Sequence, residues 1–135
     1  MTRDDIKNVM LQLPGLTAHG IGIYRPGCLS SGEYAAKLSQ SRDDLLNSAE
    51  MCTKVCQWLA GKRRRKTVNR LHTSYGYKHM AEKDIGEYVT NGCFIAAAVH
   101  CGFDYSPCAD NSPNVWFNIS EKSLGIKRER LNDED

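Results

Sequence analysis

The sequence predicts an α+β fold that is mostly helical: a compact single domain of four to five helices with two or three short strands. In several stretches the apolar residues recur at three- and four-residue steps, as in amphipathic helices. Strict alternation of apolar and polar residues, which is typical of strands, is confined to short segments near residues 20–24 and 115–120. The chain has 135 residues, 41% of them hydrophobic and 25% charged, which is typical of one soluble domain. We expect one globular domain over residues 1–128 and a charged, mobile tail over residues 129–135.

The first helix is expected over residues 2–13. Thr2 can cap it, and Asp5 suits the positive end of the helix dipole. Its apolar stripe ends before Pro14, which stops the helix. The alternating segment 20–24 then predicts a strand, although its glycines weaken strand formation.

Two helices are expected between the first strand and the basic segment. A short one begins at Ser30 or Ser31 and runs through Leu38. A longer one is capped by Ser41 and ends near Gly61. Its core-facing stripe follows four- and three-residue steps and consists of Leu45, Ala49, Cys52, Cys56 and Leu59.

The second half of the chain contains two further helices and a strand. One helix starts at Thr73 or the next residue and breaks near Gly86. The other, over about residues 92–100, is apolar nearly all round and ends at Gly102, so we expect it to be the central core element. The alternation over residues 115–120 predicts a strand.

The basic charge of the chain is concentrated in residues 62–79, KRRRKTVNRLHTSYGYKH. This window holds seven Lys or Arg residues and no acidic residue, so with a net charge of +2 the rest of the chain sums to −5 (2 − 7). Concentrated positive charge attracts phosphate or an acidic protein face, and the interleaved side chains can stack on bases or bond to phosphate. The candidate binding residues are Lys62, Arg63, Arg64, Arg65, Lys66, Asn69, Arg70, His72, Tyr75, Tyr77 and Lys78.

Three interpretations of this window stay open. It contacts the backbone of DNA or RNA, or it docks on an acidic surface of another protein. The third interpretation is a solvated helix end followed by a basic loop, because cations offset the negative end of a helix dipole. A homodimer is left open as a further mode of association.

The sequence favours neither a metal site nor an enzyme. Its cysteines show no CxxC spacing, lie mostly on apolar helix stripes and are interpreted as reduced core thiols, so we expect no metal or other cofactor. No nucleophile elbow and no glycine-rich phosphate loop is present, so we expect no catalysis. The six cysteines are Cys28, Cys52, Cys56, Cys93, Cys101 and Cys108.

The sequence also argues against a membrane protein. The longest apolar run, residues 93–101, is shorter than the roughly 20 apolar residues that span a bilayer. The first residues, MTRDDIKNVM, lack the basic and apolar regions of a signal peptide. We therefore expect a cytoplasmic protein with no membrane partner.

Two blocks, SYGYKH at residues 74–79 and NGCFIAAAVHCGF at residues 91–103, resemble a pattern found in small, largely uncharacterised proteins of phages, plasmids and integrated mobile elements. With SPNVWFNIS at residues 112–120, the resemblance covers about residues 70–120. It implies a genetic context but no reaction and no residue role. In that context, small proteins are mostly DNA-binding regulators or inhibitors of host defence, including anti-CRISPR proteins.

The leading functional prediction is a small nucleic-acid-binding accessory or regulatory protein of a mobile genetic element. It would contact phosphates through residues 62–79 with weak sequence discrimination. The alternative is a host-defence inhibitor, anti-CRISPR-like, that binds a protein effector stoichiometrically without catalysis.

Overall fold

The computed structural model describes residues 1–24, 27, 29–109 and 111–125, and its fold is α+β and mostly helical, as predicted. The predicted tail over residues 129–135 lies outside the described residues. Within them the elements are α1 (Arg3–Gln12), β1 (Leu16–Thr17), β2 (Gly20–Ile21), α2 (Ser31–Leu46), α3 (Ala49–Leu59), β3 (Arg64–Asn69), α4 (Ser74–Ile85), α5 (Asn91–His100), β4 (Tyr105–Pro107), β5 (Val115–Ile119) and the 3₁₀ turn η1 (Lys122–Leu124). No helix in this described part is long and apolar enough to cross a bilayer.

The predicted start of α1 is confirmed in atomic detail. The Asp5 amide donates to Thr2 Oγ1 at 3.1 Å, and the Thr2 amide donates to Asp5 Oδ2 at 2.8 Å. This reciprocal pair is a capping box, which satisfies two donors that the first turn leaves open. The helix buries Ile6, Val9 and Met10 against the core.

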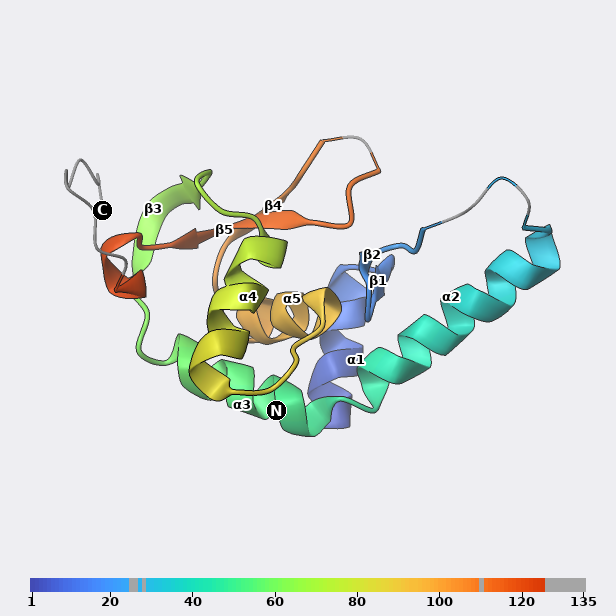
Figure 1. Ribbon diagram of the computed structural model, residues 1–135, viewed down its shortest axis with the longest axis horizontal. Helices are drawn as coiled ribbons and strands as arrows, with labels where there is room; N and C mark the ends of the chain where they lie inside the picture. Colours follow the sequence, from blue (N-terminus) through green and yellow to red (C-terminus); the bar gives the residue numbers. More distant parts are fainter. Residues whose placement is uncertain (25–26, 28, 110, 126–135) are drawn as a thin grey trace.

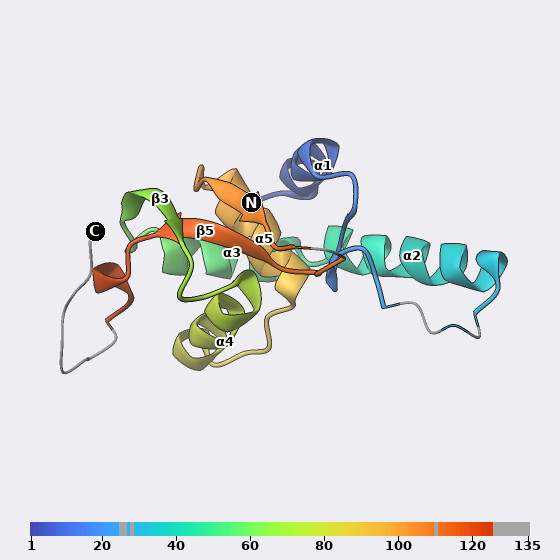
Figure 2. The ribbon, with the colours of Figure 1, turned by 90° about the horizontal axis from the view of Figure 1, so that it is seen from above.

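The break predicted between residues 38 and 41 is wrong, because α2 is continuous from Ser31 to Leu46. No glycine or proline interrupts residues 33–46, and Gln40 Nε2 donates to Asp44 Oδ1 at 2.9 Å across the predicted break. Ser41 is therefore an interior helix residue. The break instead follows Leu46, and α3 begins at Ala49. Figures 1 and 2 show α2 extending away from the rest of the molecule.

The helix α5 is the centre of the core, as predicted. Every residue from Asn91 to Val99 is buried, and α5 packs against α1, α3 and α4 in the middle of the molecule (Figures 1 and 2). The Phe103 amide donates to the Ala98 carbonyl at 3.1 Å, and Gly102 adopts a φ of 88°. This left-handed glycine ends the helix as the sequence predicts.

The larger sheet has the antiparallel order β3-β5-β4. Its central strand β5 was predicted, and Val115, Phe117 and Ile119 are fully buried on its core side. The edge strands β3 and β4 were not predicted: the segment 64–69 was interpreted as helix end and loop. Edge strands need no apolar alternation, and their pairing partner β5 lies far away in the sequence.

The smaller sheet is a two-stranded hairpin of β1 and β2. The strand predicted over residues 20–24 is reduced to Gly20–Ile21, because its partner β1 has only two residues. The hairpin places the residues between its strands against the start of α5, where the Gly92 amide donates to the Ala18 carbonyl at 3.0 Å.

Replacing Ala97 with leucine should lower the free energy of unfolding by roughly 1–3 kcal/mol. Ala97 has no exposed surface, and added methyl groups would have to displace neighbouring helices. Thermal melting followed by circular dichroism measures the effect. Ala36→Leu on the exposed side of α2 is the matched control and should change stability by less than about 0.5 kcal/mol. Equal melting of the Ala97 variant and the wild type would show that α5 is not enclosed there.

Candidate nucleic-acid interface

The basic residues lie on an arch at one edge of the larger sheet. We call residues 62–70 the basic arch. β3 pairs with β5 so that Arg64 lies opposite Ile119 and Asn69 lies opposite Phe117. The chain therefore advances by five residues in β3 where it advances by only two residues in β5. The three extra residues bulge away from the sheet and expose the arch on the side of the molecule far from the free end of α2 (Figure 1).

The first half of the basic arch is fixed by hydrogen bonds to β5 and to the segment that follows it. The Arg63 amide donates to Ser123 Oγ at 3.1 Å, and the Arg63 carbonyl accepts from the Ser120 amide at 2.7 Å. Asn118 Nδ2 donates to the Arg65 carbonyl at 2.9 Å, which fills the gap that the bulge opens. The backbone that carries the exposed cations is therefore held in place before any ligand binds.

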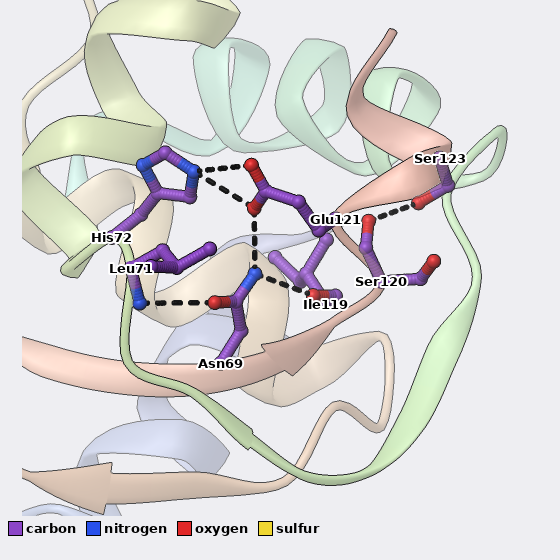
Figure 3. Close-up of polar contacts among 7 residues, drawn as sticks. All are labelled: Asn69, Leu71, His72, Ile119, Ser120, Glu121 and Ser123. Carbon is purple, nitrogen blue, oxygen red and sulfur yellow. Dashed lines mark hydrogen bonds and ion pairs between the residues drawn. The ribbon is translucent and has the colours of Figure 1, made fainter. Parts of the chain in front are cut away.

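The second half of the arch is fixed by a buried polar cluster, shown in Figure 3. Asn69 Nδ2 donates to Glu121 Oε1 at 2.9 Å and to the Ile119 carbonyl at 3.2 Å, while Asn69 Oδ1 accepts from the Leu71 amide at 3.0 Å. His72 Nε2 lies 2.9 Å from Glu121 Oε1. Glu121 is only 2% exposed, and a buried carboxylate needs such partners to offset its lost hydration.

Three of the arch cations also stabilise the fold. Arg64 donates to the Cys101 carbonyl and, at 3.3 Å, to the Gly102 carbonyl, and its guanidinium lies 4.6 Å from the Phe103 ring centroid. It thus offsets the negative end of α5. The other two stack on indole rings: Lys62 lies 4.4 Å from the Trp58 ring and Arg70 lies 4.3 Å from the Trp116 ring.

The other three arch cations make few contacts of their own. Arg63 and Lys66 are exposed, and among the described residues no side chain or carbonyl accepts a hydrogen bond from either side chain. Arg65 has one long contact, from Nη2 to Thr67 Oγ1 at 3.4 Å. Within the described part of the chain no carboxylate pairs with a Lys or Arg of the arch. Among the residues that the structure describes, the positive field of the arch is therefore not neutralised by a paired carboxylate.

The structure places four of the eleven candidate binding residues wholly or partly inside the fold. Asn69 and Tyr77 have no exposed surface and Lys78 is 4% exposed, so none of them can reach a partner from the fold described. Tyr77 stacks on Phe94 in the core, and Lys78 Nζ donates to Glu82 Oε1 at 2.8 Å. His72 is half-buried and bound to Glu121.

Tyr75 is the exposed aromatic residue among the candidates. It is 51% exposed and packs edge-on against His79 with the ring centroids 4.5 Å apart. It lies on the first turn of α4, beyond the basic arch. The sequence predicts a basic segment, but it does not separate the outward side chains from the inward ones, because the bulged strand is not predicted.

The arch has a second physical role as a protected sheet edge. β3 is an outer strand, and lysine and arginine on an edge strand hinder unwanted pairing with other chains. This role explains cations along β3 itself. The protection of a sheet edge does not explain why Arg63, which precedes the strand, is exposed and has no paired carboxylate among the described residues.

Comparisons with protein-family models, with curated proteins and with solved structures find no match to this chain. The resemblance to mobile-element proteins therefore stays a prediction.

The cysteines face one another across α3 and α5. Cys52 and Cys93 are fully buried with their sulfur atoms 3.2 Å apart. Cys56 and Cys101 form the second pair, at the half-buried end of the same helix contact. No group of three or more His, Cys, Asp or Glu side chains in the described residues could hold a metal ion, and Cys28 lies outside these residues.

Cys101 should be the most reactive of the described thiols at neutral pH. The hydrogen bond from the Cys56 thiol, assisted by the Arg64 guanidinium, lowers the pKa of Cys101 to about 7, whereas burial raises the pKa of Cys108. Since the thiolate is the nucleophile, alkylation of Cys101 by iodoacetamide should be half-maximal near pH 7. Peptide mass spectrometry across pH 6–9 measures both sites in one sample. Equal rates at Cys101 and Cys108 throughout would contradict the pairing.

Proposed function

We propose that this protein is a small nucleic-acid-binding accessory or regulatory protein of a mobile genetic element, and that it binds the phosphate backbone with its basic arch. The observation that supports this best is the basic arch, whose fixed backbone carries Arg63, Arg65 and Lys66 with no carboxylate paired to them among the described residues. Because the backbone of the arch is already fixed, binding has to restrict only the side chains of these cations.

The chemistry of the arch favours backbone contact over base reading. Arginine and lysine neutralise phosphates and release condensed counterions, a term that does not depend on sequence. A recognition helix would instead present side chains to base edges, and the apolar helix α5 is buried from Asn91 to Val99. We therefore expect binding with weak sequence discrimination.

The experiment that tests this proposal is a titration of a fluorescein-labelled oligonucleotide, single-stranded or duplex, with the wild-type protein at roughly 50 mM salt. Fluorescence anisotropy should show saturable binding that weakens linearly in a log–log plot against salt. Absence of binding to DNA and to RNA at this salt would contradict the proposal.

The alternative is stoichiometric, non-catalytic binding of the arch to an acidic surface of a defence effector. The same exposed cations favour it, since such a surface resembles a phosphate row in charge. Absence of nucleic-acid binding in the titration would favour this alternative.

A further inference from the structure

A hollow of about 340 Å³ lies beside the start of α4, away from the arch itself. It is bordered by the turn between β1 and β2, the first turns of α4, the loop before α5 and the loop before β5. Its volume falls within the range of small-ligand sites, of roughly 300–1,000 Å³. The side chains that matter for its chemistry are those of His19, Tyr75, Lys78, Tyr88, Asn91 and Asn114.

Two exposed tyrosine rings flank this hollow and are positioned by one buried ammonium group. Tyr75 is 51% exposed and Tyr88 is 72% exposed. Lys78 Nζ lies 5.1 Å from the Tyr75 ring centroid and 4.6 Å from that of Tyr88, and its charge is paired with Glu82. Cation–π attraction thus holds both rings at the entrance, where their remaining surface is open to a planar ligand.

Asn91 borders the hollow, and hydrogen bonds of its amide nitrogen fix its side chain. Asn91 is 6% exposed, and its Nδ2 donates to the His19 carbonyl at 3.1 Å, to the Pro113 carbonyl at 3.2 Å and to Asn114 Oδ1 at 2.9 Å. These bonds fix the orientation of the amide. Asn91 Oδ1 accepts no hydrogen bond from the described residues. Because this oxygen has almost no exposed surface, Asn91 shapes the wall of the hollow but offers a ligand no acceptor there.

We propose that this hollow binds one unpaired base of a nucleic-acid strand whose phosphates lie on the basic arch. This inference rests on the proposed function. A base offers a flat face on which the exposed rings of Tyr75 and Tyr88 can stack. Tyr75 follows Arg70 by five residues, so their Cα atoms are at most roughly 18 Å apart, a span that a few nucleotides can bridge.

The test compares three fluorescein-labelled 12-mers: single-stranded oligo-dA, the same strand with abasic sites, and an oligo-dA·oligo-dT duplex. Tyr88→Ala should weaken binding of the single strand by about 5- to 150-fold, the loss expected for one stacked base. Tyr88→Phe keeps the ring and should bind like the wild type. The abasic strand and the duplex, which present no unpaired base, should bind Tyr88→Ala and the wild type equally.

Each outcome separates this inference from the proposed function. If Tyr88→Ala binds the single strand like the wild type while loss of the arch cations abolishes binding, the inference is wrong and the proposed function stands. If Tyr88→Ala weakens the duplex and the abasic strand to the same extent, the ring does not select an unpaired base and the inference is wrong. If the wild type binds none of the three, the inference is wrong, and absence of RNA binding as well would overturn the proposed function.

Discussion

Replacing Arg63, Arg65 and Lys66 together with alanine is expected to weaken duplex binding by between about 10²- and 10³-fold near 50 mM salt. Each phosphate contact contributes roughly 0.9 to the log–log salt slope, so the slope should fall by roughly 2.7. Arg64 is left in place because it bonds to the Cys101 and Gly102 carbonyls at the end of α5. Anisotropy titrations at four salt concentrations give both numbers.

The control for this triple variant removes the same charge elsewhere. Lys7, Lys37 and Lys83 are exposed on α1, α2 and α4, and their replacement with alanine lowers the net charge equally. This control should keep most of the wild-type salt slope. If both triple variants lose affinity to the same degree, net charge alone drives binding and the arch is not a site.

Replacing Gly92 with alanine is expected to destabilise the fold by roughly 3 kcal/mol or more. A Cβ atom on Gly92 would overlap the Thr17 carbonyl oxygen and lie 2.7 Å from the Thr17 carbonyl carbon and 2.9 Å from the Ala18 Cα. These are backbone atoms of the β1–β2 hairpin, so no side-chain rotation relieves the clash. Thermal melting should show a decrease in Tm of about 10 °C or more.

Gly76→Ala is the matched control, because it is the same substitution inside another helix. A Cβ on Gly76 would meet only His72 Cβ, at an ordinary 3.8 Å. Alanine favours helix over glycine by roughly 0.5–1 kcal/mol, so this variant should be as stable as the wild type or more so. Equal stability of the Gly92 and Gly76 variants would contradict the close contact between α5 and the hairpin.

The parts of the fold that the sequence predicts are those specified by neighbouring residues. Thr2 and Asp5 cap α1, and Gly102 ends α5, through contacts that span only a few positions. Such signals are readable because the interacting groups are close in the chain. The predicted boundary between two helices at Ser41 is wrong because a serine can cap a helix and is also tolerated inside one.

The parts that the sequence could not predict depend on long-range pairing. Asn69 is buried because Glu121, 52 residues away, accepts its hydrogen bond. Nothing near Asn69 distinguishes it from the exposed polar residues beside it. Lys78 carries a readable signal, since Glu82 lies four residues later on the same helix face and forms an ion pair with it. The hollow beside α4 joins four segments and has no signature in any one of them.

The most direct test of the account is a map of the binding surface by NMR. The ¹⁵N-labelled wild-type protein is titrated with an unlabelled oligonucleotide, and the backbone amide shifts are followed residue by residue. We expect the largest shifts over residues 62–71, with the signals of α1 and α2 unchanged. Unshifted arch signals together with large shifts elsewhere would show that the basic arch is not the nucleic-acid interface.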